Sequence, residues 1–464
     1  MGVRGLQTFM EKSSPDAAHE VNIKDIVRSY RRETGREVVI VVDGSSCLRP
    51  LYGRLDWICG GQVREYVEVF QNFIQAFQDI GVKLVFFFDG PTQARKRKVW
   101  VERRLKSLMD VYRVFDHIGR GKHLSQLGGD TILLPPATSY LAAHAIKTSE
   151  GCEVHRSVKE CDEEIADYAR QHNCFAILGQ DSDYVIYDGP QYYLSAVHLN
   201  VEKMTTINYN RWALSRQLQL APSLLPLLAS LVGNDIVRSD DLLPFHQRLC
   251  KPQNRNARHN FKGRPSPRDV IYNVAKFIRD NVDERNLFQA LPMISKRVFG
   301  DVGKASHLQL SVRSYSVNTS TEHCPEKAES SQQTSESQNS WKIIQKNAET
   351  RFKDGNLDSM VYAIMCGLPY ESSTGLEDFR KLELPPSAAV YQPLRQRIYG
   401  IILHEMPGDP ENRVVEEWCM AGEGSLNGPS RVCVILPRPG SSPAVGVLLI
   451  TRDYPAYSQV ENLC

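Results

Sequence analysis

The amino-acid sequence predicts an α/β fold, with a mainly parallel sheet flanked by helices, over roughly its first 300 residues. Two continuous apolar runs, residues 38–43 and 84–89, each end in an aspartate. Unbroken runs of β-branched and aromatic residues are typical of strands buried on both faces of a parallel sheet. Between them, residues 62–80 place apolar residues at intervals of three and four, as an amphipathic helix does. A strand, a helix and a strand in succession indicate a doubly wound domain.

Further elements continue this alternation. Residues 132–134 and 175–178 are shorter apolar runs, which we interpret as two more strands of the sheet. Residues 160–172 begin with polar residues and continue with amphipathic spacing, which predicts a helix.

The composition changes near residue 300. Residues 311–340 are dominated by Ser, Thr, Gln and Glu without apolar periodicity, which is typical of a disordered linker. After it, residues 341–366 have a helical pattern, and residues 388–405 and 431–436 again carry apolar patterning. We therefore expect an α/β domain with a helical extension at 1–300, a disordered linker at 301–340 and a partial C-terminal α+β module at 341–464.

Bulk properties narrow the class of protein. The formal net charge of the 464 residues is only +2, so any attraction for nucleic acid must be local. No apolar stretch reaches the about 18 residues of a membrane span, so we expect no membrane partner. The 11 cysteines are scattered without a Cys-x-x-Cys pair, which favours reduced thiols in the cytosol or nucleus.

Two targeting signals are not expected at the N-terminus. Its first residues lack the apolar region of a signal peptide. Leu6 stands where an N-myristoylation signal needs Ser or Thr, so Gly2 requires another explanation.

Carboxylates recur where functional groups of a parallel sheet gather, at the carboxyl ends of strands and the starts of helices. The set is Asp43, Asp89, Glu160, Asp162, Asp181, Asp183 and Asp235. Each alone is more often a strand end, a turn residue or a helix cap, but together they indicate a cluster. Clustered carboxylates repel one another unless cations neutralise them, and Mg²⁺ or Mn²⁺ takes such oxygen ligands. Two such ions would support phosphodiester hydrolysis.

These residues resemble the flap endonucleases and XPG-type nucleases, which have a PIN-like fold. The opening Met-Gly-Val-Arg-Gly-Leu is similar to theirs, and the acids match in order over residues 1–240, with Gly-Asn-Asp at 233–235 where the family has Gly-Ser-Asp. The resemblance implies metal ligation by all seven carboxylates, with Asp43 and Asp89 also catalytic. It implies that Lys96 and Arg103, seven and fourteen residues after Asp89, hold the target phosphate.

Two basic segments, residues 95–106 and 248–268, are candidate contacts for RNA or DNA backbone. Each is alternatively a solvated surface, a helix in the first case and a loop in the second. Trp100 within the first segment either stacks on a base or packs inside the protein.

The chain departs from active nucleases after Asp235, because the glycine-rich helix-turn-helix element that grips duplex DNA is missing. Several segments instead resemble the constitutive coactivator of PPAR-gamma family, whose members carry an XPG-like domain on non-nuclease proteins. These segments are residues 57–62, 84–90, 171–174, 178–184, 231–236 and 391–399. The resemblance implies a nuclear transcriptional coactivator of nuclear receptors such as PPAR-gamma, and a chain that is a short form or a fragment.

A receptor-binding Leu-x-x-Leu-Leu pattern occurs at Leu224, Leu227 and Leu228. A docking helix must be exposed, and this one lies on an apolar run that is expected to be buried. We therefore interpret it as core.

Three functions remain open from the sequence. The first is a nuclear transcriptional coactivator, which the resemblance along most of the chain favours. The second is a Mg²⁺-dependent structure-specific nuclease, which the intact acids support. The third is a non-catalytic RNA-binding adaptor that uses the basic segments. Nuclear location follows from the first, with the cytoplasm as a second site.

Overall fold

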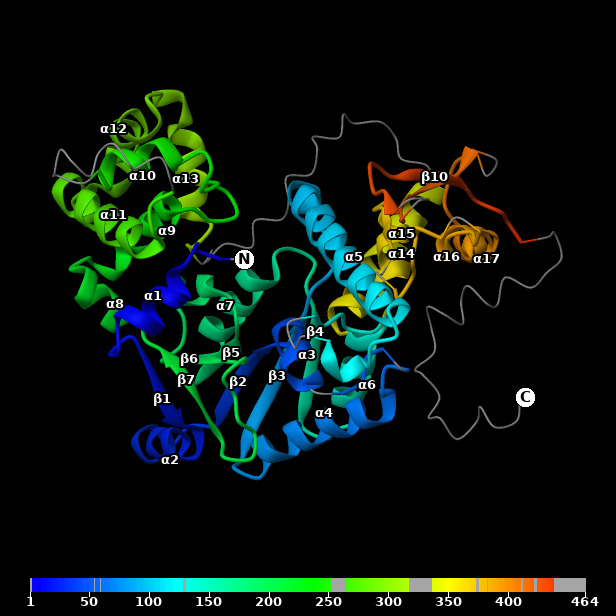
Figure 1. Cartoon of the computed structure of the whole chain (residues 1–464), viewed down its shortest axis with the longest axis horizontal. Helices are drawn as coiled ribbons and strands as arrows, with labels where there is room; N and C mark the ends of the chain where they lie inside the picture. The colour runs from blue at the N-terminus through cyan, green and yellow to red at the C-terminus, as the bar shows by residue number, and fades with distance from the viewer. Residues whose placement is uncertain are drawn as a thin grey trace.

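The computed structural model describes residues 2–53, 55–58, 60–127, 131–251, 264–316, 336–372, 375–381, 383–409, 412–420 and 424–437. Its centre is a seven-stranded sheet of order β1-β7-β6-β5-β2-β3-β4 (Figure 1). The strands are β1 (Ala18–Asn22), β2 (Val38–Asp43), β3 (Val82–Phe88), β4 (Cys152–Arg156), β5 (Ala176–Gly179), β6 (Tyr192–Ser195) and β7 (Thr205–Tyr209). Neighbours from β6 to β4 pair in parallel, whereas β7 is antiparallel to β6 and to β1. The mainly parallel α/β class is confirmed.

The predicted strands at 38–43, 84–89 and 175–178 are confirmed within a residue or two. The predicted strand at 132–134 is wrong, because these residues lie in a loop that runs into Pro135 and Pro136. Proline has no amide hydrogen to donate to a strand ladder. The edge strand is β4 instead, whose alternating polar residues gave no continuous apolar run.

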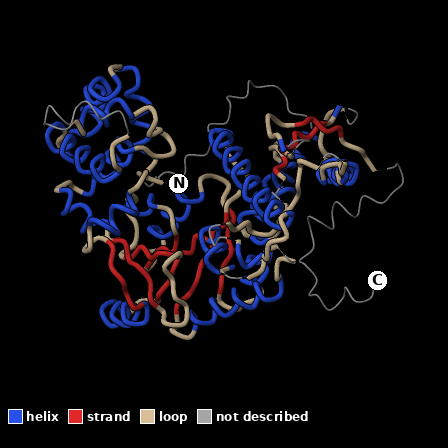
Figure 2. Tube along the Cα trace, viewed as in Figure 1, coloured by secondary structure: helices blue, strands red, loops and turns tan. Residues whose placement is uncertain are grey.

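Helices cover both faces of the sheet (Figures 1 and 2). Those packed on one face are α2 (Ile23–Thr34), α3 (Gly44–Tyr52), α4 (Val63–Gln78) and α6 (Thr138–Lys147). Those on the other face are α1 (Leu6–Ser13) and α7 (Cys161–Gln171). Along β3, Leu84 and Phe86 join the first core, and Val85 and Phe87 join the second. Burial on both faces is why the strand is apolar throughout.

A cluster of helices extends the second core. It comprises α8 (Arg211–Leu218), α9 (Leu225–Val232), α10 (Leu243–Leu249), α11 (Pro267–Asn281), α12 (Leu287–Phe299) and α13 (Ala305–Arg313). Leu224, Leu227 and Leu228 are buried in its interior, at 5%, 0% and 0% exposure. The Leu-x-x-Leu-Leu pattern is therefore core, as predicted.

The linker predicted at 301–340 is wrong at both ends. Helix α13 lies inside that range because Leu308 and Val312 pack into the core of the helical cluster. Helix α14 (Glu336–Lys353) also begins inside it. Residues 317–335 lie outside the described residues, and the division of the chain into three parts stays a prediction.

A C-terminal module combines helices with a small sheet of order β10-β9-β8. Its elements are α14, α15 (Ser359–Met365), β8 (Tyr370–Glu371), α16 (Ser387–Val390), α17 (Gln392–Ile402), β9 (Val414–Trp418) and β10 (Ser430–Cys433). Inside it, Arg395 Nε donates to Glu417 Oε1 over 2.8 Å, and Tyr399 Oη donates to the same oxygen over 2.6 Å. The module lies beside the long helix α5 (Arg97–Gly119) and the sheet edge at β4 (Figure 1).

Among the described residues, no helix combines the length and apolarity that crossing a membrane requires.

Candidate metal centre

The chain topology brings the predicted acids to one edge of the sheet. Asp43 ends β2, Asp89 follows β3, and Asp181 and Asp183 follow β5, so the parallel strands deliver them to the same side. The other two loci are the start of α7 and the turn after α9. A cleft of about 630 Å³ is lined by Asp43, Asp89, Glu160, Asp162, Asp181 and Asp235, together with Lys96 and Arg103. Asp183 lines an adjoining pocket that shares Glu160, Asp162 and Asp235 with the cleft.

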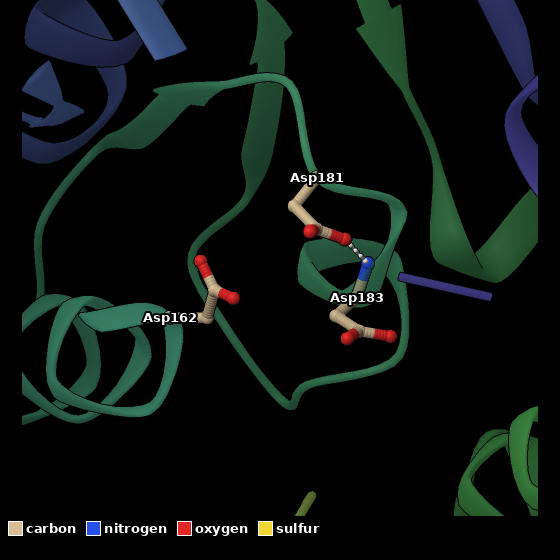
Figure 3. A group of neighbouring side chains, drawn as sticks. All are labelled: Asp162, Asp181 and Asp183. Atoms are coloured by element: carbon tan, nitrogen blue, oxygen red, sulfur yellow. Dashed lines mark hydrogen bonds between the residues drawn. The ribbon is translucent and has the colours of Figure 1, made fainter. Parts of the chain in front are cut away.

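The innermost group consists of Asp162, Asp181 and Asp183. One carboxylate oxygen from each lies within 4.8 Å of the others. Figure 3 shows Asp162 at the start of α7 and the other two on the loop opposite. The backbone N–H of Asp183 donates to Asp181 Oδ1 over 3.1 Å, which fixes the loop that carries both.

Two tyrosines hold the acids in place. Tyr184 Oη lies 2.9 Å from Asp162 Oδ1 and 3.4 Å from Asp43 Oδ2, so its single hydrogen favours Asp162. Tyr315, just beyond α13, donates to Asp183 Oδ1 over 2.8 Å. These tyrosines were not predicted, because hydrogen bonds across elements leave no local pattern in a sequence.

Burial and mutual repulsion disfavour charge on three of the acids. Burial and then the charge of Asp89 raise the pKa of Asp43 to about 6, although hydrogen bonds from Ser46 oppose this. Burial and then the charge of Asp181 raise the pKa of Asp162 and of Asp183. The cluster is therefore under electrostatic strain that a cation would relieve.

A lysine compensates two other acids of the cleft. Lys96 Nζ lies 2.5 Å from Glu160 Oε2 and 3.1 Å from Asp235 Oδ2, and Arg95 Nη2 lies 2.7 Å from Glu160 Oε1. Burial would lower the pKa of Lys96, but its hydrogen bond to Glu160 and the charges of Asp235 and Glu160 outweigh burial and raise it. The ammonium is thus a built-in counter-ion of the acids.

Trp100, one of the residues lining the cleft, packs against other side chains of this chain. The guanidiniums of Arg97 and Arg104 lie 5.2 and 5.0 Å from its ring centre, and the ring of Trp418 meets it edge to face at 6.2 Å. Of the two interpretations left open by the sequence, this geometry supports packing.

Gly2 contacts the acidic loop directly. A Cβ atom at this position would lie 2.0 Å from Asp181 Oδ1 and 2.4 Å from Ser182 Oγ, and its φ is +46°. Only glycine fits such a contact and such a backbone without displacing the loop. This close approach is the explanation that Gly2 required.

A cleft residue from outside the α/β domain was also missed. Glu371, in β8 of the C-terminal module, lines the same cleft as Asp89 and Lys96. It is 282 residues from Asp89 in the sequence, and only the docking of the module brings the two together.

The second basic segment, 248–268, is described only in part, since residues 252–263 lie outside the described residues. Arg248 Nη2 donates to the backbone oxygens of Arg297 and Val298, each over 3.0 Å. Arg264 Nη2 lies 2.5 Å from Asp240 Oδ1. These two arginines already have intramolecular partners.

The donor set fits a hard divalent cation. Its grouped ligand atoms are carboxylate oxygens, with three from separate side chains close enough to share one ion. Such oxygen-only sets suit Mg²⁺ and Mn²⁺. Asp162, Asp181 and Asp183 would hold the ion, with Asp43, Asp89, Glu160 and Asp235 around it.

Comparison with known proteins relates the chain to one group of coactivators. A family profile described as "FAM120A-like domain" matches residues 218–319. The human "Constitutive coactivator of peroxisome proliferator-activated receptor gamma" is 36% identical over 317 residues, which cover 66% of this chain and 34% of that protein. The bovine protein of the same name is 29% identical over 512 residues, covering 98% of this chain and 72% of that protein. The chain thus spans about a third of the length of the human relative it matches.

Two solved structures align with about two thirds of the chain. The catalytic core of Rad2 with DNA substrate has 15% identity and a TM-score of 0.37, covering 67% of this chain and 100% of that one. Flap endonuclease-1 from Methanococcus jannaschii has 10% identity and a TM-score of 0.34, covering 68% of this chain and 99% of that one. Identities and TM-scores this low do not indicate the activity of this chain.

Proposed function

Because the chain is related in sequence to the constitutive coactivators of PPAR-gamma, we propose that it is a nuclear transcriptional coactivator of a nuclear receptor of the PPAR-gamma type. The observation that carries this proposal is the alignment with the bovine coactivator over 98% of the chain. The alignment extends beyond the acidic cleft and therefore supports a role for the whole chain. Nuclear location is part of the same proposal.

The receptor contact must lie outside the Leu-x-x-Leu-Leu pattern, because its leucines are buried. Exposed apolar side chains are the better candidates, since they lose unfavourable hydration on binding. In the C-terminal module, Leu384, Val390, Tyr391 and Leu394 are 74%, 55%, 60% and 57% exposed. All four lie on or just before the helices α16 and α17.

A reporter assay with the PPAR-gamma ligand-binding domain tests the proposal. We expect the full chain to raise receptor-driven transcription, and the double variant Tyr391→Ser, Leu394→Ser to lose that gain while remaining folded. Trp212→Ser is the matched control, because Trp212 is also 57% exposed but lies on α8. Failure of the wild-type chain to raise transcription in cells that express it would contradict the proposal.

A second candidate function rests on the grouping of Asp162, Asp181 and Asp183. We propose that this centre binds Mg²⁺ or Mn²⁺ and that the cleft accepts a phosphodiester. The bound ions would activate water and stabilise the leaving oxygen. Arg103, which lines the same cleft, would bind the phosphate as a cation, and Lys96 would join it on leaving Glu160 and Asp235. The glycine-rich duplex grip is missing after Asp235, so the substrate would be single-stranded or branched.

A cleavage assay separates this candidate from simple metal binding. The full chain with Mn²⁺ would cut a 5′-flap DNA, and Asp181→Asn would remove the cut. Metal binding without any cleavage would leave the cleft as a binding site and would rule out the nuclease.

The third alternative, an RNA-binding adaptor, has less support. It relies on the basic segments, yet Arg95 and Lys96 pair with Glu160, and Arg97 pairs with Glu371. A phosphate backbone would have to displace these carboxylates.

A further inference from the structure

The C-terminal module packs against the start of helix α5. The guanidinium of Arg97, the first residue of α5, lies 5.2 Å from the ring centres of both Trp100 and Trp418. Trp100 belongs to α5, whereas Trp418 ends β9 of the module. A cation beside two indole rings is a favourable contact, and here it joins the two parts of the chain.

Glu371 adds hydrogen bonds and an ion pair to this contact. Its Oε1 accepts from Arg97 Nη1 over 2.7 Å and from the backbone N–H of Thr92 over 3.2 Å. Its Oε2 accepts from Thr92 Oγ1 over 2.8 Å. The side chains of Arg97 and Glu371 are only 14% and 19% exposed, so water screens this ion pair weakly. One carboxylate of the module thus fixes both ends of the segment 92–97.

Further contacts run along α5. Leu108 packs with Phe379, Met420 and Leu426 of the module in a small buried cluster. At the far end, Arg380 Nη1 pairs with Asp116 over 2.8 Å. The module therefore holds α5 over much of its length, which argues for a specific docked state.

The gripped segment carries the counter-ion of the acidic cleft. Lys96 lies inside the segment fixed by Glu371, and its ammonium occupies the space between Glu160 and Asp235. A divalent ion that recruits these two carboxylates must displace that ammonium. Displacement moves the residue next to Arg97, and so it strains the contact with Trp418 and Glu371.

We propose that docking of the C-terminal module controls which cation occupies the acidic cleft. In the docked state, Glu371 and Trp418 hold Lys96 between the acids. In the undocked state, Lys96 leaves and a divalent cation binds more tightly. Coupling of this kind is reciprocal, so divalent cations also weaken docking. This inference rests on the proposed metal site and assigns Glu371 as a positioning residue that acts through Arg97 and Thr92.

Mn²⁺ titration of the full chain by calorimetry tests the coupling. We expect Trp418→Ala and Glu371→Gln each to lower the Kd for Mn²⁺ by about fivefold, within the usual range of coupling between sites. Simple electrostatics predicts the opposite for Glu371→Gln, because the variant removes negative charge from the cleft. Glu416→Gln is the matched control, since Glu416 is an exposed carboxylate on β9 of the same module.

A second background isolates the role of Lys96. Lys96→Met removes the competing ammonium, so it should lower the Kd for Mn²⁺ by itself. Adding Trp418→Ala to this variant should then leave the Kd unchanged. Hydrogen exchange gives a readout independent of any catalysis: Mn²⁺ should speed amide exchange in residues 97–108 and 414–420 of the wild type.

The outcomes separate the coupling from the site. Mn²⁺ binding that is equally tight in the wild type, Trp418→Ala and Glu371→Gln would overturn the coupling and leave the metal site in place. An additive effect of Trp418→Ala in the Lys96→Met background would also overturn it. Absence of Mn²⁺ binding in every variant would remove the metal site and this inference together.

Discussion

Lys96 Nζ lies 2.5 Å from Glu160 Oε2, one of the acids around the three that would hold a divalent cation. The ammonium also reaches Asp235, so one side chain compensates two carboxylates. This arrangement compensates two of the seven acids at this edge of the sheet. A metal ion that recruits Glu160 or Asp235 would compete with a residue of the chain itself.

Asp181→Asn should stabilise the metal-free protein. The charge of Asp181 raises the pKa of Asp43, Asp162 and Asp183, so its removal relieves repulsion on all three. The amide oxygen of asparagine can still accept the N–H of Asp183. We expect a gain of about 1 kcal/mol in the free energy of unfolding, measured by urea denaturation in chelator.

Asp16→Asn is the control for that gain, because Asp16 is exposed and lies outside the cleft. If the Asp181→Asn protein were no more stable than the wild type, the charge of Asp181 would not repel the other acids.

The free energy of unfolding should depend on pH in the opposite sense to that of a protein stabilised by an ordinary salt-bridged carboxylate. The pKa of Asp43 is raised from 3.8 to about 6 in the folded state. Between these values the folded chain binds more protons than the unfolded chain, so stability falls as pH rises. We expect Asp43 to contribute a loss on the order of 3 kcal/mol between pH 4 and pH 7 without divalent ions, seen as a lower urea midpoint. Asp162 and Asp183 add losses of the same sign.

Asp43→Asn removes this contribution and should make the fall in stability shallower over the same range, while Asp162 and Asp183, whose pKa values are also raised, still contribute. A wild-type stability that increases steadily from pH 4 to pH 7 would contradict the buried, repelled state of Asp43.

Gly2→Ala should damage the metal centre more than the fold. The new Cβ would meet Asp181 Oδ1 and Ser182 Oγ, so the acidic loop must shift. Loss of ligand orientation costs about tenfold or more in metal affinity, which Mn²⁺ calorimetry would record.

Gly35→Ala is the matched control for the Gly2 substitution. Gly35 also has a positive φ, +66°, but a Cβ there would meet nothing within 4 Å. Equal effects of the two substitutions on Mn²⁺ affinity would show that the contact between Gly2 and Asp181 is unimportant.

Leu228→Ala should unfold the helical cluster rather than abolish a docking surface. Leu228 is fully buried, and a truncation of this kind typically costs about 2–5 kcal/mol. Thermal unfolding of the wild type and of Leu228→Ala, together with their binding to the PPAR-gamma ligand-binding domain, checks this. If Leu228→Ala kept its wild-type melting temperature but lost receptor binding, the leucine would be a contact residue after all.

The sequence allowed the prediction of those site residues that follow regular elements. Asp43 and Asp89 were predictable because each ends a continuous apolar strand, and parallel pairing then places them together. Glu160 and Asp162 were predictable from the start of an amphipathic helix. These positions depend on local pattern and on the geometry of parallel sheets.

Other features depend on docking between distant segments and were missed. Glu371 sits in a strand of two residues, too short for any periodic signal, and reaches the cleft through its contacts with Thr92 and Arg97. Tyr315 reaches Asp183 from beyond α13, inside a range that the composition assigned to a linker.

The edge strand β4 was missed because its polar residues alternate with apolar ones.

The most direct test of the central claim is the Mn²⁺ binding isotherm of the full chain compared with Lys96→Met and Asp181→Asn. We expect saturable binding to the wild type, tighter binding to Lys96→Met and weak or lost binding to Asp181→Asn. Lack of binding to Lys96→Met, in which the built-in counter-ion is gone, would contradict the claim that these carboxylates form a cation site.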